Sequence, residues 1–121
     1  MSRLHRSDAL EDLRLALRRF ADERDWDQFH SPKNLAMALT VEAAELLEHF
    51  QWLTEAKSKR PPGDAMQEIR HEMADVLLYL IRLADKLEVD LRLAATEKMK
   101  LNARKYPVHK ARGSNKKYTK L

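Results

Sequence analysis

Residues 68–87 read EIRHEMADVLLYLIRLADKL, and this stretch decides the fold. Its Ile, Val and Leu residues recur at spacings of three and four, which predicts a helix with one apolar face. Glu72 and Asp75 are three positions apart and lie at the edge of that face, not on the polar side of the helix. The stretch therefore predicts a core helix that carries two carboxylates beside its apolar side.

A second acidic pair, Glu42 and Glu45, has the same spacing in an apolar stretch that we expect to form a helix over residues 32–53. If the two helices are antiparallel neighbours, the two pairs face each other. Carboxylates gathered near a core lose hydration and repel one another, so protonation or a bound cation must compensate. The other interpretation, solvated acids on a helix surface, is less favoured because both pairs border an apolar face.

Oxygen ligands alone favour Mg²⁺, with Mn²⁺ as a second choice, and these ions commonly bind phosphates as well. A carboxylate-bridged di-iron site in a helical bundle needs the pattern Glu-x-x-His on two helices. The sequence has one such match, Glu68 to His71, so the di-iron interpretation is not favoured.

Composition indicates one all-α domain of the four-helix-bundle type. The 121 residues include two Gly, four Pro and no Cys, which excludes a disulfide framework and thiolate chemistry. We expect a cytoplasmic protein without a membrane span, because the longest apolar run, Val76–Ile81, is short.

Four helices and one real loop are expected along the chain. The first follows Ser7 as N-cap and ends near Asp25, and the second begins at the N-cap Ser31 with Pro32. We expect the loop over residues 54–64. The third helix should cover residues 64–87, opened by a capping box from Asp64 to Gln67, and the fourth residues 90–106. We expect residues 1–107 to form the catalytic domain and 108–121 an irregular basic tail.

The net charge of +4 is concentrated at the C-terminus. Residues 104–121 hold seven Lys or Arg and no acid, which leaves 16 basic against 19 acidic residues in the rest of the chain. A basic tail on an acidic helical body suggests an alternative function, a nucleic-acid-binding or adaptor protein. A solvated tail is favoured over this alternative.

Three aromatic residues, Trp26, Trp52 and Tyr79, are candidates to stack on a nucleobase, although ordinary core or interface positions are equally plausible for them. Lys98 and Asn102 share one face of the fourth predicted helix and are weaker candidates to hold phosphate oxygens.

The sequence resembles the MazG-like all-α nucleoside triphosphate pyrophosphohydrolases, whose hallmark is Glu-x-x-Glu followed at a distance by Glu-x-x-Asp. Here the two pairs are separated by 26 residues. Within that superfamily it is most similar to the dCTP pyrophosphatases. The similar stretches are FADERDWDQFH (20–30), PKNL (32–35), FQW (50–52), DVLLYL (75–80), KM (98–99), KYP (105–107) and KYT (117–119).

This resemblance implies Mg²⁺-dependent cleavage of a dNTP, dCTP or a related pyrimidine nucleotide, to dNMP and pyrophosphate, by a homotetramer or dimer. It implies that Glu42, Glu45, Glu72 and Asp75 bind the metal. Our own hypothesis is that Glu42 or Glu45 orients or deprotonates the attacking water. The resemblance also implies a substrate-binding set made of Trp26, Asp27, Gln28, Phe29, His30, Trp52, Tyr79, Lys98 and Asn102.

One position departs from the animal dCTP pyrophosphatases, which carry a substrate-facing histidine nine residues before the tryptophan. This chain has Leu17 there. The reaction type is therefore better supported than the preferred base, and methylated or other pyrimidine nucleotides remain open.

Overall fold

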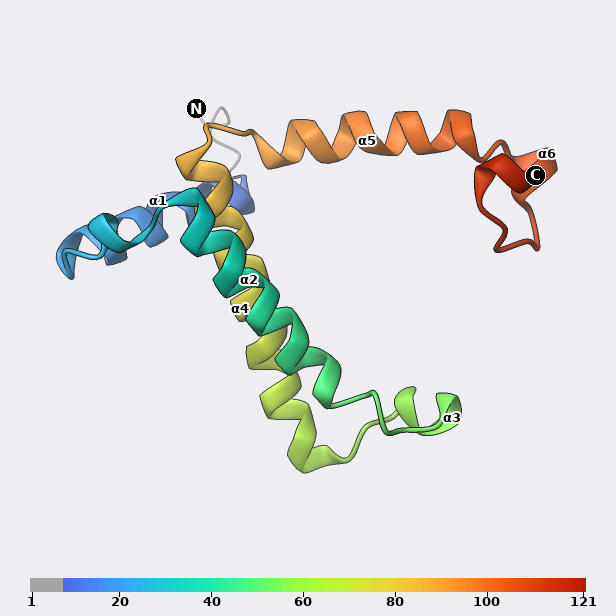
Figure 1. The fold of residues 1–121 in the computed structure, drawn as a ribbon, viewed down its shortest axis with the longest axis horizontal. Coiled ribbons are helices and arrows are strands. Elements are labelled where there is room, and N and C mark those ends of the chain that lie inside the picture. The colour runs from blue at the N-terminus through green and yellow to red at the C-terminus, as the bar shows by residue number, and fades with distance from the viewer. Residues whose placement is uncertain (1–7) are drawn as a thin grey trace, which may run out of the picture. The chain divides into compact units, whose positions relative to one another are not determined.

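The computed structural model describes residues 8–121, which form helices and turns with no strand among them. The chain forms two compact units, the first ending at Val89 and the second running from Asp90 to Leu121. Figure 1 shows the helices of each unit, which are described in turn. The all-α prediction is confirmed.

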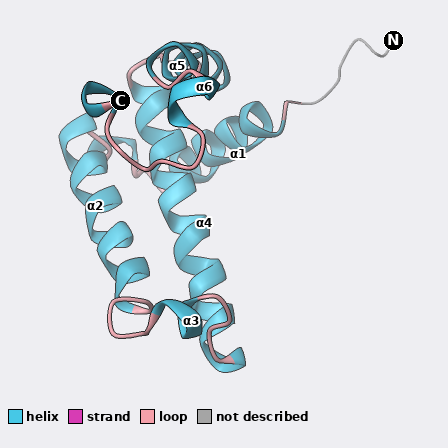
Figure 2. Cartoon of the chain, turned by 90° about the vertical axis from the view of Figure 1, so that its right-hand side faces the viewer, coloured by secondary structure: helices cyan, strands magenta, loops and turns pink. Residues whose placement is uncertain are grey.

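The first unit is built on two long helices that lie side by side. They are α2 (Pro32–Glu48) and α4 (Gly63–Lys86), joined by a segment that contains the short helix α3 (Glu55–Ser58). Figures 1 and 2 show that α2 and α4 run in opposite directions, as the sequence predicted. Helix α1 (Ala9–Glu23) packs against α4. The core side chains are Ala21, Leu35, Ile69, Ile81 and Ala84.

The predicted N-caps of the first unit are partly confirmed. Ser31 caps α2, where its side chain accepts a hydrogen bond of 3.1 Å from Asn34 N, and Pro32 follows as the first helical residue. Ser7 lies outside the described residues, and the cap of α1 is Asp8, whose Oδ1 accepts from Leu10 N at 3.0 Å.

Helix α1 ends two residues earlier than expected because the chain enters the left-handed region at Asp25, with φ 55°. Trp26 N donates to Ala21 O at 2.9 Å, which closes the helix in the hydrogen-bond pattern of a Schellman motif. The next residues form a 3₁₀ turn, η2 (Asp27–Phe29). At this closed helix end, Trp26 contacts Phe20, with ring centroids 5.6 Å apart.

Helix α2 also ends early, at Glu48 and not at Leu53. Residues 49–53 continue as tight turns, such as Leu53 N to Phe50 O at 2.9 Å. Thr54 is extended and its side chain accepts from Lys57 N at 3.2 Å, which caps α3. The expected loop over 54–64 is therefore wrong in part, since it contains one helical turn.

The expected capping box at Asp64 is wrong. Helix α4 begins at Gly63, and its N-cap, Pro62, makes no side-chain hydrogen bond. The Pro62 carbonyl accepts from Ala65 N at 3.0 Å and Met66 N at 3.2 Å. Asp64 instead lies within the first turn, where a carboxylate interacts favourably with the helix dipole.

The second unit begins with α5 (Leu91–Lys105), capped by Asp90 as predicted. The expected irregular tail is wrong in two places, α6 (Val108–Ala111) and the 3₁₀ turn η3 (Tyr118–Lys120). Pro107 ends one helix and starts the next, because its carbonyl accepts from Ala111 N at 2.9 Å. The Tyr106 and Tyr118 rings meet edge to face at 6.0 Å.

The structure divides the chain after Val89, whereas the sequence placed a boundary after Pro107. The expected catalytic stretch, 1–107, thus spans the first unit and α5. Across residues 8–121, no helix combines the length and apolar character needed to cross a membrane.

Candidate active site

Helices α2 and α4 bring three carboxylates together. Glu42, Glu45 and Glu72 each offer one oxygen, and these oxygens lie within 4.8 Å of one another. The antiparallel pairing of the two helices produces this cluster, because it places the two acidic pairs at the same level. The predicted approach of the pairs is thereby confirmed for these three residues.

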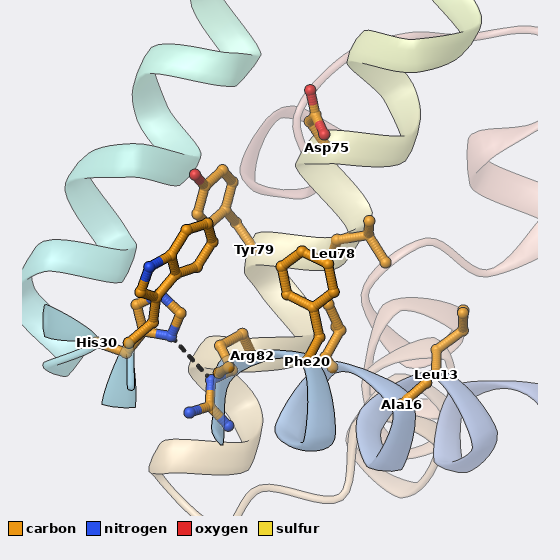
Figure 3. Close-up of a pocket in the computed structure, with 11 residues that line it drawn as sticks. Leu13, Ala16, Phe20, His30, Asp75, Leu78, Tyr79 and Arg82 are labelled. Carbon is orange, nitrogen blue, oxygen red and sulfur yellow. Dashed lines mark hydrogen bonds between the residues drawn. The ribbon is translucent and has the colours of Figure 1, made fainter. Parts of the chain in front are cut away.

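Asp75 lies one turn after Glu72 on α4 and is not in that group of three. It is still close enough for its charge to contribute to a raised pKa at Glu42. Figure 3 shows its carboxylate at the rim of a cavity, above Tyr79. Asp75 therefore lies between the carboxylate cluster and the cavity.

The carboxylate cluster is electrostatically unfavourable without a cation. Burial, together with the neighbouring carboxyls of Glu45 and Glu72, raises the pKa of Glu42 to about 7. Oε2 of Glu42 and Oε2 of Glu72 are both buried, and neither has a hydrogen-bond partner within the described part of the chain. Buried oxygens without partners cost free energy, and a hard divalent cation would satisfy them. These residues fit Mg²⁺.

A cavity of about 440 Å³ adjoins the cluster in the first unit. Figure 3 shows that it opens between α1, the connector that carries His30, and α4. Its lining consists of Leu13, Ala16, Leu17, Phe20, Ala21, Trp26, His30, Asp75, Leu78, Tyr79 and Arg82. Most of these side chains are apolar or aromatic, and a few polar groups lie among them, which is typical of a small-molecule site.

Arg82 is the only charged residue among those the structure describes as buried, with 4% of its surface exposed. Its Nε donates to His30 Nδ1 at 3.1 Å, Nη2 to Asp27 Oδ1 at 2.8 Å and Nη1 to Asp85 Oδ2 at 3.2 Å. Lys86 forms a second ion pair with Asp27. This network joins the floor of the cavity to the 26–30 connector.

Two groups in this network have shifted pKa values. Burial lowers the pKa of His30, and the charges of Arg82 and Lys86 lower it further, which favours neutral imidazole. Burial opposes ionisation of Asp85, but its hydrogen bonds from Arg18 and Arg14 outweigh burial and hold its pKa below the usual value. Arg14 Nη1 lies 2.8 Å from Asp85 Oδ1.

The predicted substrate-binding set divides into two groups. Trp26, His30 and Tyr79 line the cavity. Trp52 does not line the cavity, and 86% of its surface is exposed. The remaining members of the 26–30 segment do not line it either: Asp27 bonds Arg82, Gln28 bonds Asp25, and the Phe29 carbonyl accepts from Asn34.

Lys98 and Asn102 are both exposed residues of α5, in the second unit. They are four positions apart on this helix, as predicted. Their assignment to phosphate binding stays a prediction.

Sequence reasoning missed Arg82. It follows Asp75 by seven residues and Tyr79 by three, so the three side chains share one face of α4. A single arginine inside the apolar run of this helix was the signal that could have found it. Leu17, which the sequence marked as a departure from related proteins, does line the cavity.

A sequence profile described as the MazG-like family matches residues 37–121. The chain belongs to the MazG-like family. It is 49% identical over 115 residues to human dCTP pyrophosphatase 1, covering 93% of this chain and 67% of that protein. The mouse dCTP pyrophosphatase 1 is 47% identical over 114 residues, with the same coverage.

A solved structure supports the same assignment. A crystal structure of a pyrophosphatase from Archaeoglobus fulgidus DSM 4304 superposes on this MazG-like chain with a TM-score of 0.79 and 41% sequence identity. The match covers 85% of this chain and 96% of that chain. The predicted all-α MazG-like fold is confirmed, and the chain is an enzyme of the nucleotide pyrophosphatase class.

Proposed function

We propose that this enzyme hydrolyses a pyrimidine deoxynucleoside triphosphate, with dCTP as the first candidate, to dNMP and pyrophosphate in a Mg²⁺-dependent reaction. The observation that carries the proposal is the pair of buried, unpartnered oxygens on Glu42 and Glu72. They lie in a carboxylate cluster that Asp75 links to an aromatic-lined cavity. The names of the mammalian relatives, dCTP pyrophosphatase 1, support the choice of nucleotide.

The metal would be held by Glu42, Glu45, Glu72 and Asp75, with Mn²⁺ as an alternative ion. Bound Mg²⁺ would polarise a phosphoryl oxygen and offset the negative charge of the triphosphate. The chain's own contribution is a set of carboxylates on two packed helices. Because α2 and α4 are long and lie side by side, they would hold these carboxylates in position before substrate arrives.

Glu42 or Glu45 would orient the attacking water and accept its proton. The water attacks the α-phosphorus, the bond from that phosphorus to the bridging oxygen breaks, and pyrophosphate leaves. Lys98 and Asn102 remain our candidates for contacts to the phosphates.

The nucleoside would occupy the cavity. Trp26 and Tyr79 present aromatic surface there, and stacking on such surface contributes about 1–3 kcal/mol per base. Leu17 contributes an apolar wall. An apolar wall can also accommodate a methyl group on the base, so methylated pyrimidine nucleotides are further candidate substrates.

We also propose that the chain is a homo-oligomer, a tetramer or a dimer. Large apolar side chains are exposed on α2 and α4, including Met37 (54%), Leu47 (55%) and Met73 (57%). Association of chains would cover these side chains and increase the buried apolar surface of a small protein.

The test of the function is a substrate panel with purified protein. Eight nucleotides, the four common dNTPs, dUTP, 5-methyl-dCTP, CTP and dCDP, are incubated with Mg²⁺ and the products separated. We expect pyrophosphate and monophosphate from the pyrimidine deoxynucleotides, and no product without a divalent ion. Turnover of none of the panel with Mg²⁺ or Mn²⁺ would contradict the proposal.

A further inference from the structure

Arg82 constrains the protonation of His30. A guanidinium group stays protonated and can only donate hydrogen bonds, so a bond from Arg82 Nε at 3.1 Å requires Nδ1 of His30 to be an acceptor. Nδ1 therefore carries no proton, and the single proton of the neutral ring lies on Nε2. The dashed line in Figure 3 marks this bond between α4 and the connector.

The position of Arg82 is itself fixed on both sides. Nη2 lies 2.8 Å from Asp27 Oδ1, and Nη1 lies 3.2 Å from Asp85 Oδ2. Asp85 also accepts from Arg18 Nη2 at 2.5 Å. With 5% of the Arg82 side chain exposed, the guanidinium has little freedom to turn away from His30.

The other nitrogen of His30 has no assigned role. Among residues 8–121 the ring makes one hydrogen bond, the one from Arg82, which leaves Nε2–H without a partner. The ring lines the cavity beside Trp26, with centroids 6.3 Å apart at an interplanar angle of 65°. A donor at the edge of an aromatic platform is well placed to meet the edge of a stacked base.

We propose that Arg82 is a positioning residue that holds His30 as the Nε2–H tautomer, so that His30 donates a hydrogen bond to the carbonyl oxygen of a pyrimidine in the cavity. This inference rests on the proposed function for its substrate. The low pKa of His30 agrees with it, since burial and the charges of Arg82 and Lys86 disfavour a second proton.

Nitrogen-15 NMR of the full-length wild-type protein at pH 7.5 tests the tautomer directly. His30→Gln serves to assign the His30 signals among the five histidines. We expect an unprotonated signal from Nδ1 and a protonated one from Nε2. A proton on Nδ1, or an even mixture of tautomers, would overturn the inference, whatever the enzyme turns out to hydrolyse.

Kinetics test the consequence. Arg82→Met should raise KM for dCTP about tenfold, the effect of losing one well-placed hydrogen bond, while kcat changes less than twofold. The matched control is Lys86→Met, which removes the other cation bonded to Asp27 but no bond to His30, and should leave KM unchanged. An unchanged KM in Arg82→Met, or an equal rise in both variants, would overturn the positioning role.

Arg82→Met can fail to fold because it leaves the carboxylate of Asp85, whose side chain is 5% exposed, with one partner fewer. His30→Phe then replaces it, since this variant keeps an aromatic ring and removes the donor. A rise of about tenfold in KM supports the donor role, and an unchanged KM refutes it. If the wild-type protein cleaves no nucleotide, the proposed function is wrong, and the NMR result still tests the tautomer of His30.

Discussion

Glu42 on α2 and Glu72 on α4 each bury a carboxylate oxygen without a hydrogen-bond partner in the described chain, and their carboxylates face the same small space. Two buried carboxylate oxygens without hydrogen-bond partners lower the stability of the metal-free protein. Burial and its acidic neighbours raise the pKa of Glu42 to about 7, because ionising this carboxyl costs free energy there. A site of this kind favours cation binding at the expense of stability.

The first prediction concerns the opposite effects of these carboxylates on cation binding and on the stability of the metal-free protein. Glu42→Gln removes one charge from the cluster at almost constant shape, so it should raise the melting temperature of metal-free protein on the order of 4 °C. It should also abolish the stabilisation that Mg²⁺ gives the wild type. Differential scanning calorimetry with EDTA and with Mg²⁺ measures both effects.

Glu48→Gln is the matched control, because Glu48 is an exposed carboxylate on the same helix. It should leave both melting temperatures close to wild type. A Glu42→Gln protein that melts lower than wild type in EDTA, or that keeps the full Mg²⁺ response, would be incompatible with the cation site.

A second prediction concerns acid stability. The pKa of Asp85 is lower in the folded protein than its usual value of 3.8, because hydrogen bonds from Arg18 and Arg14 outweigh its burial. A lowered pKa contributes stability that is present above the unfolded value and is lost as the pH falls through the folded value. Asp85→Asn should therefore cost about 1.5–3 kcal/mol at pH 7, the usual contribution of hydrogen bonds to a charged group, and less near pH 2.5.

Urea unfolding of wild type and Asp85→Asn between pH 2.5 and 7 checks this expectation. Glu11→Gln provides the comparison, since Glu11 bonds the same Arg14 at the surface and should matter much less. A stability difference between wild type and Asp85→Asn that does not change with pH would refute the electrostatic explanation.

A third prediction concerns base selection. Leu17 lines the cavity, and Leu17→His places a hydrogen-bonding group on that apolar wall. The resemblance to dCTP pyrophosphatases with a histidine at this position predicts that kcat/KM for dCTP rises relative to dTTP by about tenfold. Leu17→Met, which keeps the wall apolar, should leave the ratio unchanged. An unchanged ratio in Leu17→His would show that selection lies elsewhere in the cavity.

A fourth prediction concerns assembly. Light scattering after gel filtration should give a mass two or four times that of the 14.2 kDa chain. Met37→Glu puts a charge on the exposed apolar face of α2 and should shift the protein toward monomer, whereas Lys33→Glu in the first turn should not. A wild-type monomer at micromolar concentration would refute the proposed oligomer.

Much of the fold follows from local sequence signals. Ser31 with Pro32, and Asp90 before α5, are N-cap signals with direct partners in the structure. The end of α2, at Glu48 and not at Leu53, was harder to place, and so was the end of α1, where Asp25 adopts a positive φ without glycine. An acidic residue, unlike glycine, gives no signal in the sequence that its φ will be positive.

The site was predictable to the extent that it depends on helix periodicity. Glu42, Glu45 and Glu72 meet because spacing along two helices and their antiparallel packing are enough to bring them together. Arg82 depends on partners 52 and 55 residues away in the sequence, His30 and Asp27. Contacts over such separations have no local signature, so the network beneath the cavity was visible only in three dimensions.

The most direct test of the central claim is product analysis with dCTP. Phosphorus-31 NMR of wild-type protein, dCTP and Mg²⁺ should show dCMP and pyrophosphate. Asp75→Ala and Glu45→Ala should each reduce the rate at least a hundredfold, on the order of the loss of one key electrostatic group. Release of dCDP and phosphate would contradict the proposed reaction. Undiminished turnover in either variant would contradict the proposal that the carboxylate cluster and Asp75 together form the catalytic metal site.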